Sequence, residues 1–256
     1  MASIDLNADL GEGYGHWRMG DDEAMLGVVT SANVACGFHA GDPEIMARCF
    51  ALAAQRGVSV GAHVSFPDLA GFGRRRIPFT PLEIERLVAY QIGAAQALAL
   101  YSGHMITYVK CHGALANVAE REPDVAMAVA RATLAVDARL TLLTIARSEQ
   151  VGAAERAGLR AANEIFADRA YTDEGRLKPR GETGAVIEDA DWAAARVLAM
   201  LTEQALITES GKRLPTPIDS ICVHGDSPHA VEMARRLSRG LTGAGYELAA
   251  FAPPWD

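Results

Sequence analysis

Ionisable and amide side chains recur at the ends of the apolar, strand-like segments of this 256-residue chain. Such groups rarely lie beside buried apolar segments unless they are paired or used in chemistry. Their repetition in segment after segment predicts one shared pocket, and therefore an enzyme. The residues are Asp5, Asn7, Asp9, Glu12, Asn33, His39, Asp42, His63, Asp68, Lys110, His112, Glu164, Asp168, His224 and Asp226.

Six of these residues are expected to lie nearest the chemistry, because carboxylates and imidazoles move protons and a lysine stabilises negative charge. Lys110 and His112 share one face of a strand, since they are two positions apart, and Cys111 would face away. We expect Lys110 to polarise a carbonyl or hold a phosphate, and His63 or His112 to act as general base. Asp226 either takes part or only supports the following turn. The predicted catalytic set is Asp9, His39, His63, Lys110, His112 and Asp226.

A second set is predicted to bind the substrate. The run Arg74–Arg75–Arg76 could hold a phosphate or carboxylate with planar guanidinium groups, although charge runs often form a solvated face. We expect only one or two of these arginines to point inward, and the same alternatives apply to Arg169 and Lys178. Asp42 is also expected to cap a helix. The predicted substrate-binding residues are Asn7, Glu12, Asn33, Asp42, Asp68 and Arg74.

Strand-like segments alternate with helical ones along most of the chain. Strands separated by helices pair in parallel through right-handed crossovers. Seven or eight such units fit a (β/α) barrel, with a doubly wound open sheet as the alternative. In either fold the functional groups gather at the carboxyl ends of the strands. The predicted strands are residues 4–10, 31–38, 58–64, 105–112, 140–146, 159–166 and 218–224, with a weaker one at 246–251.

The predicted helices have clear start and stop signals. Thr80, Pro81 and Glu83 form a capping box that opens a helix reaching about Tyr101. Residues 42–43 begin another, which Gly57 ends. The segment 167–189 is predicted to be a long loop, and loops of that length are often functional. Further helices are expected over 123–138, 149–157 and 191–210, and from Ser227–Pro228 toward Gly240.

Composition indicates a soluble globular protein, with half of the residues hydrophobic and 22% charged. The net charge of −8 disfavours nucleic acid and anionic membranes as partners. We expect no secretion signal and no membrane span. The four cysteines, Cys36, Cys49, Cys111 and Cys222, lie mostly in apolar segments without a C-x-x-C pair, which is typical of reduced thiols in the cytoplasm.

Six separated segments resemble the LamB/YcsF family, and the resemblance runs from residue 5 to the last strand. It implies a single domain over residues 1–256, a seven-stranded barrel variant related to glycoside hydrolases and polysaccharide deacetylases. Where family members usually have proline and tyrosine, this chain has Cys111 and Ala116, which argues against Cys111 as a nucleophile. The segments are DLNADLGEGYG (5–15), SANVACGFHAGDP (31–43), GAHVSFPDLAGFGRR (61–75), VKCHGALAN (109–117), FADRAYTDEGRL (166–177) and CVHGDSP (222–228).

The resemblance also implies an activity, which is the ATP-dependent opening of the 5-oxo-L-proline lactam to L-glutamate. Two further 5-oxoprolinase subunits are implied as partners. Lactam opening requires a stabilised carbonyl oxygen, a positioned water and a proton for the departing nitrogen. The chain contains no G-x-x-x-x-G-K-[ST] motif, so the sequence leaves open whether ATP binds here or on a partner. The sequence does not determine the oligomeric state, and a homo-oligomer is one of the possibilities.

A divalent metal is a further hypothesis. Asp9, His63 and His112, each from a different strand end, could form an open metal site. The order of these residues is similar to that of the metal ligands in small carbohydrate deacetylases. His104 and His229 are instead expected to be satisfied core histidines.

Two other functions remain in competition with ATP-dependent lactam opening. One is a metal-dependent deacetylase or amidase that acts without ATP, which would hydrolyse its substrate alone. The other is a non-catalytic subunit that binds 5-oxoproline or a partner. The number of ionisable groups argues against binding alone, because burying unused charges is costly.

Overall fold

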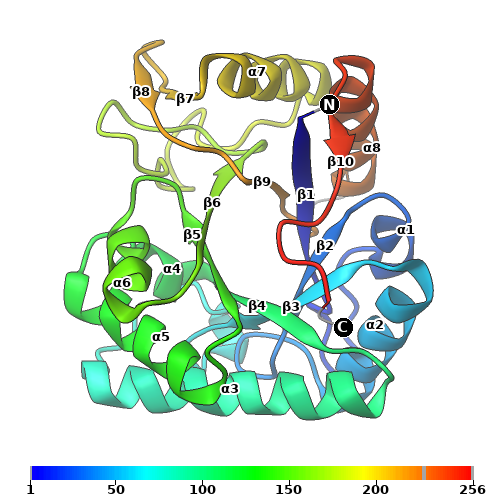
Figure 1. The fold of residues 1–256 in the computed structure, drawn as a ribbon, viewed down its shortest axis with the longest axis vertical. Helices are drawn as coiled ribbons and strands as arrows, with labels where there is room; N and C mark the ends of the chain where they lie inside the picture. Colours follow the sequence, from blue (N-terminus) through cyan, green and yellow to red (C-terminus); the bar gives the residue numbers. More distant parts are fainter. Residues whose placement is uncertain (1, 227–228, 255–256) are drawn as a thin grey trace.

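Seven parallel strands close into a barrel in the computed structural model, which describes residues 2–226 and 229–254 (Figure 1). Each strand pairs with its neighbour along the chain from β1 to β6, and β9 closes the ring by pairing with both β6 and β1. The predicted α/β barrel is therefore confirmed. Its strands are β1 (Ser3–Leu10), β2 (Ser31–Ala35), β3 (Ser59–Val64), β4 (Ile106–Cys111), β5 (Thr141–Ile145), β6 (Ala161–Phe166) and β9 (Ser220–Val223).

Alternation along β1 shows how the barrel is built. Leu6 and Ala8 belong to the hydrophobic core, whereas Asn7 and Asp9 contact polar side chains of other strands. Successive side chains of a strand point to opposite faces, so the apolar set packs under the helices and the polar set fills the barrel. The interior of this barrel is therefore a column of polar groups.

Helices cover the outside of the barrel, and the strongest start signals are confirmed. The Thr80 side chain and Glu83 form the capping box at the start of α3. Asp42 caps α2, which ends at Gly57 with a left-handed φ of 66°. The helices are α1 (Asp22–Leu26), α2 (Pro43–Arg56), α3 (Pro81–Tyr101), α4 (Gly113–Ala119), α5 (Pro123–Val136), α6 (Glu149–Ala157), α7 (Ala190–Glu203) and α8 (Ala230–Gly243), with a 3-10 turn at Leu69–Gly71.

The prediction of one helix over 191–210 is wrong. The helix α7 ends at Glu203, where Gln204 adopts a left-handed conformation, and the chain then forms an antiparallel hairpin of β7 (Ala205–Ile207) and β8 (Arg213–Pro215). The short helices α1 and α4 were not predicted. The weak strand at 246–251 is reduced to β10 (Glu247–Leu248), which pairs with the start of β1. The predicted start of the last helix at Ser227–Pro228 lies outside the described residues.

The end of the barrel opposite the carboxyl ends of the strands is plugged by aromatic packing. The rings of Tyr108 and Phe251 lie 4.9 Å apart between centroids, and Thr107 donates a hydrogen bond to the carbonyl of Ala252 at 2.7 Å. Gly61 makes room for Tyr108, since a Cβ at that position would lie 2.3 Å from the tyrosine ring. Among the described residues, these contacts fill that end of the barrel interior.

Among the described residues, no helix combines the length and apolar character needed to cross a bilayer.

Candidate active site

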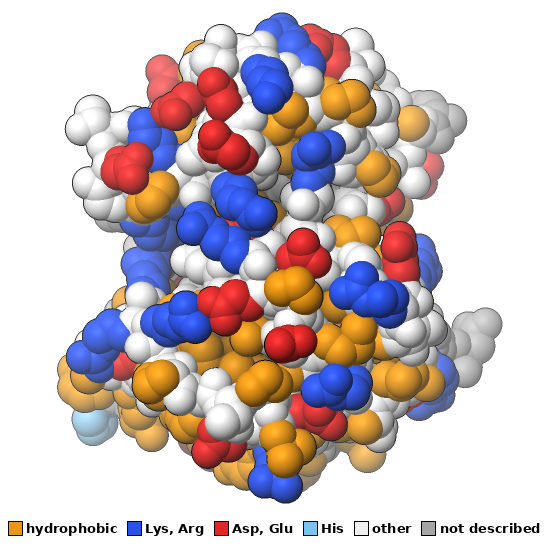
Figure 2. Space-filling model, turned by 90° about the vertical axis from the view of Figure 1, so that its left-hand side faces the viewer, with side chains coloured by type: hydrophobic (Ala, Val, Ile, Leu, Met, Phe, Trp, Pro, Cys, Tyr) orange, Lys and Arg blue, Asp and Glu red, His pale blue; other side chains and the backbone are white. Residues whose placement is uncertain are grey.

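A pocket of about 460 Å³ opens at the carboxyl ends of the strands. Its lining includes Asp9, His63, Lys110 and His112, so four of the six predicted catalytic residues converge as expected. The long loop over 167–189 contributes Arg169. Figure 2 shows several Lys and Arg side chains near the waist of the molecule, on the flank that lies on the left of Figure 1. The remaining lining residues include Arg74, Arg76, Arg121, Phe166, Lys178, Arg180 and His224.

Lys110 lies at the bottom of the pocket inside an ion network. Its Nζ is 2.8 Å from Glu164 Oε1 and 3.1 Å from Asp9 Oδ1. Burial alone would lower the pKa of Lys110, but the charge of Asp9 and its other partners raise it well above its usual value. The neighbouring carboxylates therefore favour the charged form of Lys110, and its predicted contact with substrate stays a prediction.

Asn7 and Asn33 lie below the pocket. Asn7 donates to Glu164 Oε1 at 2.8 Å, and Asn33 donates to Asp9 Oδ1 at 2.8 Å. Neither is among the described residues that line the pocket. Both amides brace the network that holds Asp9, while their proposed contact with substrate stays a prediction.

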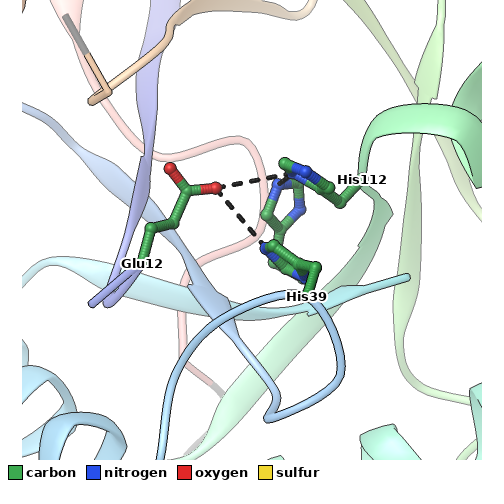
Figure 3. A group of neighbouring side chains, drawn as sticks. Glu12, His39 and His112 are labelled. Atoms are coloured by element: carbon green, nitrogen blue, oxygen red, sulfur yellow. Dashed lines mark hydrogen bonds and ion pairs between the residues drawn. The ribbon is translucent and has the colours of Figure 1, made fainter. Parts of the chain in front are cut away.

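A buried group of three imidazoles and one carboxylate forms the wall beside Asp9 (Figure 3). The group consists of Glu12, His39, His63 and His112, which we call the Glu12–His cluster. His112 Nδ1 lies 3.0 Å from His63 Nε2, and Glu12 Oε1 lies 3.5 Å from both His39 Nε2 and His112 Nδ1. The His39 and His112 rings stack with 3.8 Å between centroids.

Burial controls the charge in this region. It lowers the pKa of His39 and His112 well below the usual histidine value, and neighbouring imidazoles add to the effect. Burial also raises the pKa of Glu12, with Asp9 contributing. The opposite holds for Asp9, because the charges of His63 and Lys110 overcome the effect of burial and hold its pKa well below 3.8.

His224 and Asp168 form a pair that the sequence analysis placed at strand ends but left out of the predicted site. His224 Nδ1 lies 2.8 and 2.9 Å from the two carboxylate oxygens of Asp168. The carboxylate only accepts, so Nδ1 carries the proton and Nε2 is left with a lone pair. An imidazole oriented in this way at a pocket wall can act as a general base.

The three consecutive arginines separate, as expected. Arg74 and Arg76 line the pocket, and Arg74 pairs with Asp226 at 2.5 Å. Arg75 instead forms an ion pair with Asp68. Neither Asp226 nor Asp68 is among the described lining residues, and the ion pair is a local explanation for each.

Asp42 also has a local role. Its side chain accepts hydrogen bonds from the backbone N–H groups of Glu44, Ile45 and Gly15, which confirms the helix cap and places it away from the pocket. His104 is half-buried and bonded to the carbonyl of Val58 at 2.9 Å. His229 is exposed, so its prediction as a core residue is wrong.

Cys111 borders the pocket but packs in the hydrophobic core, and burial raises its pKa to about 12. A thiol held neutral in this way is a poor nucleophile. The environment of Cys111 therefore agrees with the expectation that it is not the nucleophile.

The fold and the pocket define a parallel (β/α) barrel with ionisable groups gathered at the carboxyl mouth, a common arrangement for enzymes. The chain belongs to the LamB/YcsF family, whose model matches residues 4–254. It is 62% identical to a 5-oxoprolinase subunit of Azorhizobium caulinodans, over 99% of this chain and 100% of that protein. It is 59% identical to the corresponding protein of Gluconobacter oxydans, over 97% of this chain and 98% of that protein. A lactam utilization protein from Thermus thermophilus has a similar structure, with a TM-score of 0.91 and 41% identity over 97% of this chain and 99% of that one.

Proposed function

We propose that this chain is the lactam-opening component of an ATP-dependent 5-oxoprolinase, which converts 5-oxo-L-proline to L-glutamate with hydrolysis of ATP to ADP and phosphate. Relatives with 62% and 59% identity are named as a subunit of 5-oxoprolinase. The structural observation that supports the proposal is the pocket itself. A carboxylate-oriented imidazole, a cationic rim and a buried carboxylate–imidazole group all face one small-molecule cavity.

The cationic rim suits the carboxylate that 5-oxo-L-proline carries. Arg74 and Arg169 lie on the pocket wall, and guanidinium groups bind carboxylates through paired hydrogen bonds. Arg169 is already fixed, because its Nε donates to the carbonyl of Ala185. Arg74 pairs with Asp226, but its side chain is half-exposed, so it is the more adaptable of the two. We assign Arg74 to the substrate carboxylate.

The bond change follows from the groups around the lactam. His224 Nε2 removes a proton from a water molecule, whose oxygen attacks the lactam carbonyl carbon. The carbon–nitrogen bond then breaks, and the nitrogen takes up the proton from the imidazole. Asp168 stabilises the imidazolium that forms in between, because both of its oxygens face Nδ1.

ATP is assigned to the step that makes the lactam reactive. Transfer of the γ-phosphoryl group of ATP to the amide oxygen releases ADP and makes the ring carbon more electrophilic. After water has added and the carbon–nitrogen bond has broken, the product is an acyl phosphate, and a second water molecule hydrolyses it to glutamate and phosphate. Since the sequence has no P-loop motif, we assign the nucleotide to the two partner subunits and the ring opening to this chain in the cytoplasm.

The test combines the purified chain with 5-oxo-L-proline, ATP and the two partner subunits, each added or omitted in turn, and follows glutamate and ADP. We expect both products only in the complete mixture. The His224→Gln variant should then greatly reduce glutamate formation without affecting assembly. Glutamate formed by this chain without ATP would contradict the proposal.

That contradicting result would support a second function, a metal-dependent amidase or deacetylase. The Glu12–His cluster favours it, because imidazole and carboxylate are the ligand types of hydrolytic zinc sites. Hydrolysis of simple amides or acetylated sugars by the isolated chain, abolished by a chelator, would identify it.

A further inference from the structure

The Glu12–His cluster has spacings close to those of a metal site, and its shortest spacing, between His112 Nδ1 and His63 Nε2, also suits a hydrogen bond. Tetrahedral zinc with bonds of 2.0–2.1 Å separates its ligand atoms by about 3.4 Å. Glu12 Oε1 lies 3.5 Å from His39 Nε2 and 3.5 Å from His112 Nδ1, and His112 Nδ1 lies 3.0 Å from His63 Nε2. One atom from each of the four residues lies within 4.8 Å of the others.

The hydrogen bond of His112 Nε2 determines the protonation of His112 Nδ1, the ring nitrogen that faces the cluster. His112 Nε2 lies 2.9 Å from the carbonyl oxygen of Phe72, which only accepts, so Nε2 carries the proton. Nδ1 therefore presents a lone pair toward Glu12 Oε1, which is also an acceptor. Metal-binding histidines commonly donate their other N–H to a backbone carbonyl in this way.

Several polar atoms of the cluster have no hydrogen-bond partner among the described residues. They are Glu12 Oε1, both ring nitrogens of His39, and His63 Nδ1. His39 and His63 are each only 1% exposed, and Glu12 is 6% exposed. Buried polar groups without partners are rare, and an ion is one of the explanations for them.

One carboxylate oxygen of Asp9 is occupied by other groups, and the predicted role of Asp9 as a metal ligand stays a prediction. Its Oδ1 already accepts hydrogen bonds from Lys110 and Asn33, and it lies 3.4 Å from His63 Nε2. A carboxylate held in this way adds negative charge beside the cluster. Glu12 and His39 have no such competing partners among the described residues.

We propose that Glu12, His39, His63 and His112 bind one divalent transition-metal ion, through Glu12 Oε1, His39 Nε2, His63 Nε2 and His112 Nδ1. Three imidazoles and one carboxylate suit zinc, cobalt or nickel, and do not suit magnesium or calcium, which prefer oxygen ligands. His63 and His112 also line the pocket, so the ion would lie in its wall. When bound, it would supply Lewis acidity there. Binding of this ion can be measured without following the lactam reaction.

The test measures binding directly. The intact chain is stripped with a chelator, dialysed, and titrated with Zn²⁺ by calorimetry and with Co²⁺ by visible absorption. We expect one ion per chain, and we expect the Co²⁺ complex to show the strong visible absorption bands of four-coordinate cobalt. Glu12→Gln and His39→Gln should each weaken binding at least about 10-fold. Removing a group that only supports a metal ligand already lowers metal affinity about 10-fold, and removing the ligand itself should lower it at least as much.

Matched variants decide which residues bind the ion. His104→Gln removes a histidine outside the cluster and should bind as the wild type does. The Asp9→Asn variant should still bind one metal ion per chain. Absence of stoichiometric binding by the wild-type chain overturns the proposal, whatever the variants do. Wild-type affinity in both Glu12→Gln and His39→Gln overturns it as well.

Discussion

His224 and Asp168 face each other across the junction of β9 and β6, with Nδ1 within 2.9 Å of both carboxylate oxygens. The two strands are neighbours in the barrel although the loop over 167–189, α7 and a hairpin separate them in the chain. The pair places an oriented imidazole on the pocket wall. Its geometry leads to the first prediction.

Replacing His224 with Gln should reduce glutamate formation by the complete enzyme about 10²- to 10⁴-fold, the usual contribution of a general base. Asp168→Asn should give a smaller loss, because the imidazole stays but loses its orientation. Initial rates at saturating substrate measure both. His104→Gln, half-buried but outside the pocket, is the control. Unchanged rates in His224→Gln would assign the base elsewhere, with His63 or His112 as the next candidates.

Arg74→Gln should raise KM for 5-oxo-L-proline at least about 10-fold with little change in kcat, since a hydrogen bond to a charged group contributes about 1.5–3 kcal/mol. Arg75→Gln is the matched control, because that side chain pairs with Asp68 and is not among the described residues of the pocket lining. Steady-state kinetics over a range of substrate concentrations separate the two parameters. Equal effects in the two variants would argue against a specific contact.

Lys110→Met should destabilise the fold by about 3–5 kcal/mol, because it leaves the buried carboxylates of Asp9 and Glu164 without their cation. Lys178→Met is the control, since its partner Glu209 is exposed and such pairs contribute less than about 1 kcal/mol. Urea denaturation measures both free energies of unfolding. A small loss of stability in Lys110→Met would mean that the side chains around Lys110 rearrange, or that Asp9 or Glu164 becomes protonated.

Asp5 should make stability fall as pH rises. Burial raises its pKa from 3.8 to about 6, although the hydroxyl groups of Ser220, Ser31 and Thr30 oppose this. The folded state therefore binds the proton more tightly than the unfolded chain. This contribution is fully present below pH 3.8 and is lost as pH rises through about 6, a change of about 3 kcal/mol at 1.36 kcal/mol per unit.

Asp5→Asn should remove that slope. Urea denaturation of the wild type and of the variant between pH 4 and 8 gives the comparison, in which the difference isolates Asp5 from other titrating groups. A difference between the two proteins that does not vary with pH would mean that Asp5 keeps its ordinary pKa in the fold.

Gly73→Ala should disturb the Glu12–His cluster. A Cβ there would lie 2.7 Å from His39 Cβ and 2.9 Å from His112 Cδ2, in addition to the cost of its φ of 64°. Gly57→Ala has a similar φ of 66° but meets no described atom within 4 Å, so it isolates the backbone cost of about 1 kcal/mol. We expect a clearly larger fall in Tm for Gly73→Ala. Equal shifts would show that the cluster tolerates the added methyl group.

Much of the fold could be predicted because local signals agree with tertiary structure. The capping box at Thr80 and the stop at Gly57 depend on neighbouring residues only. The β7–β8 hairpin could not be foreseen in the same way, since the apolar residues that follow Glu203 also suit a helix. Closure of the ring by β9 depends on the curvature of the whole sheet.

The site was partly predictable for a similar reason. Asp9, His63, Lys110 and His112 extend from strands, so the barrel geometry alone brings them together. Asp42 and Asp68 lie in loops, where nearby N–H groups and Arg75 satisfy them. The contact of Glu12 with His39 depends on the path of two loops, which no periodicity encodes. Asp168 and His224 stood at strand ends and became a pair only when the barrel closed.

The aromatic plug at the closed mouth has a consequence for mutational scans. Tyr108 packs against Phe251 and donates to Asn33, which in turn donates to Asp9. Truncating Phe251 would open a route for solvent into the column beneath the reactive groups. A substitution near the far end of the sequence could therefore change turnover without touching any ligand, and distance along the chain is a poor guide to which positions matter.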